Sequence, residues 1–234
     1  FDHGFLYGLG VFETFRIYNG HPFLLFDHLK RLRKSLLNLN IEWTLQDEEV
    51  QTILNRLIEI NELKDAYIRL NVSAGEGEIG LYTGKYSNPN TIIFIKPIHE
   101  SNIVEKEGVI LNTPRNSPEG KERLKSHHYL NNIIGKKEIG NAVHIEGIFL
   151  TKEGFLSEGI VSNLFFLKQG RLHTPHVDTG ILNGITRQFV IQWAELKGIS
   201  VEEGFYTKQE LLDADEIFIS NSILSNNLLK VFLK

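Results

Sequence analysis

Apolar and polar residues alternate along two stretches near the start of the chain, residues 11–18 and 66–74. A period of two is typical of half-buried β-strands, so both stretches are predicted to be strands. Phe12, Thr14 and Arg16 share one face of the first strand. The Asn19-Gly20 pair is typical of a tight hairpin and predicts a return strand over residues 22–26.

Helical spacing of apolar residues follows this predicted hairpin. Asp27 can cap a helix, and its apolar stripe consists of Leu29, Leu32, Leu36 and Leu39. Thr44 with Asp47 resembles a capping box and predicts that a second amphipathic helix begins there. Residues 91–96 form another predicted strand. Together these elements predict one α+β unit with mostly hairpin connections.

A cluster of Pro, Asn, Ser and Gly within residues 112–120 interrupts the pattern and predicts an interdomain linker. We therefore expect a small N-terminal domain over residues 1–112, a linker over 113–121 and a larger C-terminal domain over 122–234. The second half has a helical pattern around Leu130, short strand patterns over 145–150, 161–167, 171–174 and 216–220, and a clear helical pattern over 185–196.

Composition narrows the class of protein. The 234 residues are 41% hydrophobic and 23% charged, and 25 basic against 29 acidic residues give a net charge of −4 without a basic stripe. Nucleic acid is therefore not an expected partner. The chain has no cysteine, which excludes disulfides and thiolate zinc sites. It has no apolar run of membrane-spanning length and no charged-then-apolar leader, so we expect a cytoplasmic protein. Because it opens at Phe1 and has no methionine, we expect that an N-terminal piece precedes it.

The helix predicted over residues 185–196 follows a glycine, Gly184, that can let the backbone turn tightly. The amides of Ile185 and Thr186 would then point at one spot, and the Thr186 hydroxyl would add a donor. Helix N-termini bind anions for this reason. The alternative interpretation is a plain helix cap, which is the commoner origin of such a Gly-x-Thr sequence.

Glu158 lies between apolar segments, where a lone carboxylate is costly unless it is paired. Its partner is an arginine or a turn amide in one interpretation. In the other it is the protonated ring nitrogen of a bound heterocycle.

Lys125 directly precedes an amide-rich aromatic segment. A lysine attacks a carbonyl only in its neutral form, which requires burial or nearby cations, whereas most lysines are solvated. His127 and His128 follow it, but adjacent histidines seldom point at one metal ion and no third ligand is suitably spaced. No metal site is therefore expected, and a structural role is favoured for the two histidines.

Six short motifs together resemble those of the fold-type IV pyridoxal-phosphate enzymes, and they occur in the same order. They are Gly8-x-Gly10-Val11-Phe12-Glu13, His28-x-x-Arg31-Leu32-x-x-Ser35, Lys125 with Tyr129-Leu130-Asn131, Glu158-Gly159 with Ser162-Asn163-x-Phe165, residues 180–187, and Ser220-Asn221-Ser222. The resemblance spans nearly the whole chain. It implies a two-domain α+β fold like that of D-amino-acid aminotransferase, with a mostly antiparallel, barrel-like sheet in the larger domain, and a homodimer.

Within this family, the residues around Lys125 are most similar to aminodeoxychorismate lyases of the Gram-positive type. Branched-chain aminotransferases usually have small residues after the lysine, where this chain has His127 and His128, and the D-amino-acid enzymes usually have tyrosine at the position of Phe12. The resemblance thus implies the elimination of pyruvate from 4-amino-4-deoxychorismate, which leaves 4-aminobenzoate for folate biosynthesis. A branched-chain or D-amino-acid aminotransferase is the main alternative, and a non-catalytic metabolite-binding protein on the same fold is another.

The resemblance also implies residue roles. Lys125 would bind pyridoxal 5'-phosphate as a Schiff base and later move protons, Glu158 would keep the ring nitrogen protonated, and Tyr129 would hydrogen-bond the ring hydroxyl. The phosphate would be held by Arg31, the amides of Ile185 and Thr186, the Thr186 hydroxyl and Ser222, and Asn163 would support Glu158.

The substrate positions are inferred from strand alternation as well as from the resemblance. Tyr7, Phe12 and Thr14 would line the substrate pocket, although core packing is an equally good interpretation for Tyr7 and Phe12. Arg69 would bind a substrate carboxylate, and Thr14 would donate a proton to the leaving group.

Overall fold

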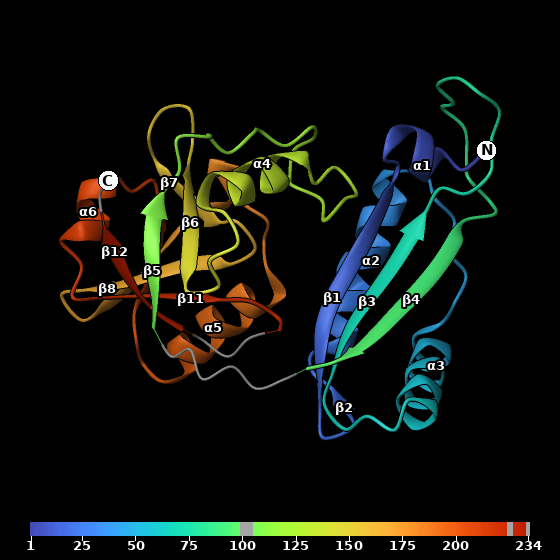
Figure 1. Cartoon of the computed structure of the whole chain (residues 1–234), viewed down its shortest axis with the longest axis horizontal. Helices are drawn as coiled ribbons and strands as arrows, with labels where there is room; N and C mark the ends of the chain where they lie inside the picture. Colours follow the sequence, from blue (N-terminus) through green and yellow to red (C-terminus); the bar gives the residue numbers. More distant parts are fainter. Residues whose placement is uncertain (99–104, 224–226, 233–234) are drawn as a thin grey trace. The chain divides into compact units, whose positions relative to one another are not determined.

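The structure is a computed structural model that describes residues 1–98, 105–223 and 227–232, with side chains up to residue 223. The chain forms two compact units (Figure 1). Unit 1 comprises Phe1–Glu100 and Leu124–His128, and unit 2 comprises Ser101–Arg123 and Tyr129–Lys234. This division differs from the predicted boundary at residue 112, because the strand β5 (Glu105–Ile110) pairs with strands of unit 2.

Unit 1 is a four-stranded sheet, and two of its helices contribute to the core on one face of it. Its strands are β1 (Gly10–Tyr18), β2 (His21–Pro22), β3 (Ala66–Ser73) and β4 (Asn90–Pro97), in the order β2-β1-β3-β4. Its helices are α1 (His3–Tyr7), α2 (Leu25–Asn38) and α3 (Asp47–Ile60). Every strand pair in this sheet is antiparallel.

The core of unit 1 follows from the alternation in its strands. The core face of β1 and β3 contributes side chains that are at most 1% exposed, namely Val11, Phe15, Ile17, Ile68, Leu70 and Val72. They pack with the leucines of α2 and with Val50 and Leu54 of α3. The opposite face of the sheet carries Phe12, Thr14 and Arg69. The predicted two-faced strands are therefore confirmed.

Three predicted details of unit 1 are wrong. The return strand is only β2, because α2 begins at Leu25 after Leu24, whose φ of 55° turns the chain. Asp27 therefore lies in the first turn of α2 and does not cap it. The capping box of α3 is formed by Gln46 and Glu49, two residues later than predicted.

Unit 2 is built on an eight-stranded sheet with the order β10-β9-β8-β11-β12-β5-β6-β7. Besides β5, its strands are β6 (Ile145–Leu150), β7 (Leu156–Gly159), β8 (Asn163–Lys168), β9 (Arg171–Pro175), β10 (Val201–Gly204), β11 (Glu216–Ser220) and β12 (Asn227–Phe232). The sheet is mixed: three strand pairs are parallel and four are antiparallel.

The helices of unit 2 are α4 (Leu130–Ile139), α5 (Ile185–Leu196) and α6 (Lys208–Leu212), with a short 3-10 helix, η1 (Val177–Thr179). The bounds of α5, β6 and β11 match those predicted from the sequence. Two apolar clusters of unit 2 lie around β8 and its neighbours, one of them including Phe165, Leu172 and Ala194 of α5.

Candidate active site

Lys125 is held against β1 by backbone hydrogen bonds. The Phe12 N–H donates to the Lys125 carbonyl oxygen at 2.9 Å, and the His127 N–H donates to the Gly10 carbonyl oxygen at 3.0 Å. Val11 and Ser126 form the β-bridge between these bonds. The segment Leu124–His128 thus adds a short antiparallel strand to β1 and belongs to unit 1. The position of Lys125 is fixed by the strand that carries Phe12.

Two glycines make room for the histidines that follow the lysine. A Cβ at Gly10 would lie 2.5 Å from His127 Cε1 and 2.8 Å from the Val72 carbonyl oxygen. A Cβ at Gly8 would overlap the ring of His128, and Gly8 also has a φ of +69°. Burial lowers the pKa of His127, and the charge of Arg69 adds to this. Both histidine rings thus pack on the Gly8-x-Gly10 segment, and the structural role favoured from the sequence stays a prediction.

Phe12 is the common neighbour of two cations. Its ring is 1% exposed, and it lies 3.7 Å from Arg69 Cζ and 4.7 Å from Lys125 Nζ, both measured to the ring centroid. The Arg69 Nε donates to Asn71 Oδ1 at 3.1 Å. Thr14, which is half-buried, pairs with Arg69 in the β1–β3 register. Unit 1 thus brings Lys125 together with three predicted substrate-pocket residues, Phe12, Thr14 and Arg69.

Tyr7 lies at the end of α1 and has its own set of contacts. Its hydroxyl oxygen accepts from the Gly80 N–H at 2.8 Å, and its ring meets the ring of His3 edge-on at 5.0 Å. His128 Nε2 lies 3.1 Å from the Tyr7 carbonyl oxygen. These contacts connect Tyr7 to the segment that carries Lys125, and its role toward a substrate stays a prediction.

Arg31 is held by a carboxylate in the core of unit 1. Its Nε donates to Glu13 Oε1 at 2.7 Å, and its Nη2 donates to Glu13 Oε2 at 2.6 Å. His28 Nδ1 lies 2.7 Å from Glu13 Oε2. Burial works to raise the pKa of Glu13, but Arg31 and His28 outweigh it and lower that pKa to about 2. Glu13 is therefore ionised and paired at neutral pH.

In unit 2, Glu158 on β7 is 7% exposed and has three partners. Arg115 Nε donates to Glu158 Oε1 at 2.8 Å, and the Leu182 N–H donates to Oε2 at 3.1 Å. Arg123 Nε lies 3.9 Å from Oε1. The predicted arginine and turn-amide partners are thus both present, while the prediction that Glu158 binds a ring nitrogen stays open.

The two arginines beside Glu158 were not predicted as site residues. Arg115 Nη1 also donates to Asn131 Oδ1 at 2.6 Å, and Arg123 Nε donates to the Gly180 carbonyl oxygen. Burial, with the nearby charge of Arg115, lowers the pKa of Arg123 to about 10. Arg115 lies within the breaker cluster at residues 112–120 and Arg123 follows it, and the need of Glu158 for a partner was the sequence feature that pointed to an arginine.

The start of α5 brings together three of the predicted phosphate-binding residues, Ile185, Thr186 and Ser222. Gly184 is the N-cap, and Thr186 Oγ1 lies 3.0 Å from Ser222 Oγ. A Cβ at Gly184 would overlap Asn163 Oδ1, so glycine lets the start of α5 approach the Asn163 side chain. Asn163 Nδ2 donates to the Ser220 carbonyl oxygen at 3.0 Å. Asn163 therefore ties β11 to the start of α5, and the hydrogen bonds to Glu158 come from Arg115 and Leu182.

Tyr129 is the N-cap residue of α4, directly after the segment of Lys125.

In the part of the chain that the structure describes, no group of three or more His, Cys, Asp or Glu residues could hold a metal ion. Among the same residues, no helix is long and apolar enough to cross a membrane.

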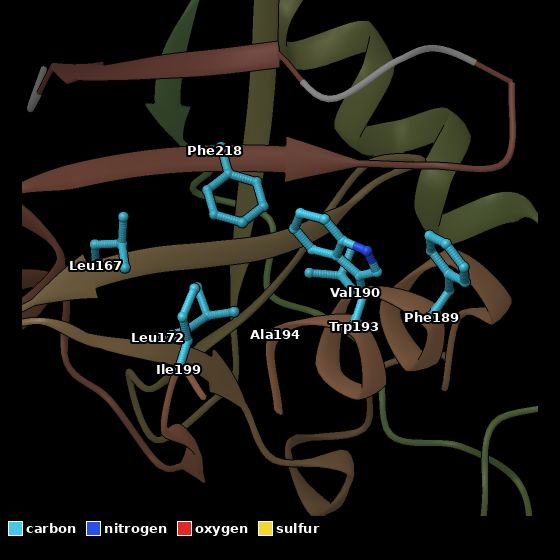
Figure 2. A pocket seen from close by; sticks show the side chains of 8 residues that line it. All are labelled: Leu167, Leu172, Phe189, Val190, Trp193, Ala194, Ile199 and Phe218. Atoms are coloured by element: carbon cyan, nitrogen blue, oxygen red, sulfur yellow. The ribbon is translucent and has the colours of Figure 1, made fainter. Parts of the chain in front are cut away.

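A separate cavity of about 370 Å³ lies in unit 2 on the side of α5 (Figure 2). It is lined by eight apolar side chains, namely Leu167, Leu172, Phe189, Val190, Trp193, Ala194, Ile199 and Phe218. Figure 2 shows rings from α5 and β11 pointing toward one another across it. It has no titratable side chain and none of the predicted site residues, so it offers no catalytic chemistry.

Comparisons with known proteins agree on one family. Residues 10–225 match the family described as amino-transferase class IV. The chain is 48% identical to an aminodeoxychorismate lyase of Bacillus subtilis (strain 168), over 96% of this chain and 78% of that protein. It is 39% identical to a putative branched-chain-amino-acid aminotransferase of Methanocaldococcus jannaschii, over 95% of this chain and 78% of that protein.

A solved structure has the same fold. It is described as a putative 4-amino-4-deoxychorismate lyase from Legionella pneumophila and superposes with a TM-score of 0.90 at 28% identity, covering 100% of this chain and 85% of the other.

Proposed function

This chain belongs to the class IV amino-transferase family, and we propose that it is a pyridoxal-phosphate-dependent 4-amino-4-deoxychorismate lyase. The reaction releases pyruvate and 4-aminobenzoate, the aromatic acid used in folate biosynthesis. The observation that carries the proposal is the match to the Bacillus subtilis lyase over nearly the whole chain, which is closer than the match to the putative aminotransferase. The family and the fold inferred from the sequence motifs are thus confirmed.

The residues present fit pyridoxal 5'-phosphate in kind. The primary amine of Lys125 suits the aldehyde, and the buried carboxylate of Glu158 suits a protonated pyridine nitrogen. The hydroxyls of Thr186 and Ser222, which lie together at the start of α5, can donate hydrogen bonds to a phosphate. The backbone amides at the N-terminus of the helix also favour an anion. When bound, the cofactor supplies an electron sink that stabilises negative charge on the substrate carbon next to nitrogen.

We assign the binding roles residue by residue. Arg31, the amides of Ile185 and Thr186, and the hydroxyls of Thr186 and Ser222 would hold the phosphate, since arginine grips phosphate with a planar pair of donors. Tyr129 would donate to the ring hydroxyl. Asn163 would act indirectly, because its side chain fixes Ser220 beside the start of α5.

Arg115 would help to position Glu158, a role that was not predicted from the sequence. Its Nε donates to Glu158 Oε1 and so holds the carboxylate that would pair with a protonated ring nitrogen. The carboxylate is also fixed in direction by the Leu182 N–H.

The proton transfers would be carried out by Lys125 and Thr14. The Lys125 Nζ removes the proton from the ring carbon that bears the amino group, and the carbon–oxygen bond to the enolpyruvyl group then breaks. The electron pair of the broken C–H bond enters the ring, which becomes aromatic. The departing enolpyruvate takes a proton at its methylene carbon and becomes pyruvate.

Thr14 is the proposed donor of that last proton, because its hydroxyl lies on the face of β1 that also carries Phe12. Replacing Thr14 by valine should slow pyruvate release about a hundredfold, the usual order for losing a general acid. Single-turnover measurements of pyruvate would check this. An unchanged rate in Thr14→Val would remove the role.

Arg69, which lies beside Phe12, is the proposed partner of a substrate carboxylate, and Tyr7 and Phe12 are the proposed pocket walls. Phe12 favours this arrangement because its ring contacts both Arg69 and Lys125. Because the Phe12 ring is buried, its main effect would be to hold Arg69 and Lys125 in position.

An aminotransferase is the rival function, and the match to the putative branched-chain enzyme is the observation in its favour. The two activities differ in one requirement: a transaminase needs a keto acid to accept the amino group, whereas the lyase turns over without one. Turnover of 4-amino-4-deoxychorismate in the absence of any keto acid is therefore the test of the proposal. A homodimer and a cytoplasmic location are part of the same proposal by resemblance to the family.

A further inference from the structure

Glu13 is a charged residue at a core position of β1. Val11, Phe15 and Ile17 occupy the same face of this strand and belong to the apolar core of unit 1. Glu13 lies between them in the alternation and is 1% exposed. A carboxylate at such a position is costly unless it is paired and hydrogen-bonded. The buried charge therefore needs a reason that core packing does not supply.

The helix that covers this face provides both partners of Glu13. His28 and Arg31 lie three residues apart on α2, which places them on one side of the helix. Each Glu13 oxygen accepts from one nitrogen of the Arg31 guanidinium, so the contact is a two-bond fork. His28 Nδ1, at 2.7 Å, holds Oε2 from a second direction. The carboxylate thereby fixes the plane of the guanidinium.

Lys125 lies close to this group within the same unit. Burial lowers the pKa of His28, and the charges of Arg31 and Lys125 add to that effect against the opposite influence of Glu13. His28 is itself 1% exposed, whereas the Arg31 side chain is 15% exposed. The pair of Glu13 and His28 is thus sealed in the core, and the guanidinium that it holds reaches the surface of unit 1.

We propose that Glu13 and His28 are positioning residues that orient the guanidinium of Arg31 for the phosphate of the cofactor. The inference rests on the proposed function, in which Arg31 binds that phosphate. Arginine has a long side chain with many rotamers, and its affinity for phosphate depends on the direction of its donors. Fixing that direction before the phosphate arrives is the advantage that a buried ion pair provides here.

Two ligands separate this role from a general structural one. Pyridoxal 5'-phosphate and pyridoxal have the same ring and aldehyde, but only the first has a phosphate. If Glu13 orients Arg31, then Glu13→Gln should raise the Kd of pyridoxal 5'-phosphate on the order of tenfold. The Kd of pyridoxal should stay within about twofold, because the lost positioning concerns the phosphate alone.

The experiment titrates the cofactor-free protein with each ligand and follows the visible absorbance of the ligand bound to Lys125. His28→Asn is the second variant, and it keeps the two hydrogen bonds between Glu13 and Arg31. It should raise the Kd of pyridoxal 5'-phosphate relative to the Kd of pyridoxal about threefold. It also decides the question if Glu13→Gln does not fold. Glu59→Gln is the matched control, because Glu59 forms an exposed ion pair with Arg56 on α3.

An unchanged ratio of the two Kd values in the folded variants would overturn the positioning role and leave the proposed function intact. Equal weakening of both ligands would also overturn it, because it would show that the cluster only supports the fold. Failure of the wild-type protein to bind pyridoxal 5'-phosphate through Lys125 would overturn the proposed function and this inference together.

Discussion

At the scale of the residue, two buried carboxylates point to requirements other than core packing. Glu13 and Glu158 are both nearly inaccessible, and each is paired with at least one arginine. Burying an ion pair seldom adds stability compared with apolar residues of similar size, so such pairs point to another requirement. For Glu158 that requirement is a bound pyridine ring in our proposal, and for Glu13 it is the orientation of Arg31.

The pKa of Glu13 predicts how acid affects stability. Its folded-state pKa of about 2 lies below the ordinary glutamate pKa of 4.5. The unfolded chain therefore binds the proton more readily, and the stabilisation is fully present above about pH 4.5 and is lost as the pH falls toward 2. A shift of this size corresponds to roughly 3 kcal/mol of unfolding free energy.

Denaturant unfolding of the wild type and Glu13→Gln between pH 3 and pH 6 would measure this contribution. The difference in unfolding free energy between the two proteins should shrink as the pH is lowered. A difference that stays constant over this range would show that the ionisation of Glu13 does not stabilise unit 1.

Sequence reasoning succeeded for residues whose chemistry is visible locally and missed those that act through a distant partner. The lone carboxylate Glu158 was predicted to have an arginine or amide partner, and it has both. Glu13 received no role, although it interrupts the apolar face of β1 at a position where a charge needs a partner. Arg115 was missed because its pairing spans 43 residues.

At the scale of the element, the strand formed around Lys125 depends on β1 and its glycines. The side chains of His127 and His128 occupy the space that a Cβ at Gly10 or Gly8 would need. This explains why a Gly-x-Gly sequence near the start of the chain and two histidines more than a hundred residues later belong to one arrangement.

Gly10→Ala tests this dependence. The added methyl group would press on His127 and on the Val72 carbonyl, so we expect a loss of about 1–3 kcal/mol in unfolding free energy. Gly120→Ala is the matched control, since no atom lies within 4 Å of its Cβ position and its φ is not positive, and it should change stability by less than about 0.5 kcal/mol.

Urea unfolding of both variants would give these values. Equal stability of Gly10→Ala and Gly120→Ala would contradict the account, because it would mean that the segment of Lys125 does not rest on Gly10.

Elements with a distinct apolar pattern were predictable even when short, and elements without one were not. The bounds of α5 and β11 follow from sequence, whereas β7 and β10 have four residues each and no distinctive pattern. The return strand was predicted too long because Leu24 adopts a positive φ, where α2 begins. An apolar residue rarely adopts such a φ, so the sequence pattern does not indicate it.

At the scale of the whole molecule, the division of the chain into units depends on strand pairing between distant segments. β5 pairs in parallel with β6 and with β12, the latter more than a hundred residues later. The breaker cluster after β5 suggested a boundary at residue 112, because local composition carries no information on such pairings. For the same reason, no sequence pattern indicated that residues 124–128 return to unit 1.

The most direct test of the proposed function is the reaction itself. The purified protein, loaded with pyridoxal 5'-phosphate, should convert 4-amino-4-deoxychorismate into 4-aminobenzoate and pyruvate in equal amounts without any keto acid, and Lys125→Ala should form neither product. Absence of 4-aminobenzoate, together with transfer of an amino group from an amino acid to a keto acid, would contradict the assignment and show that the chain is an aminotransferase.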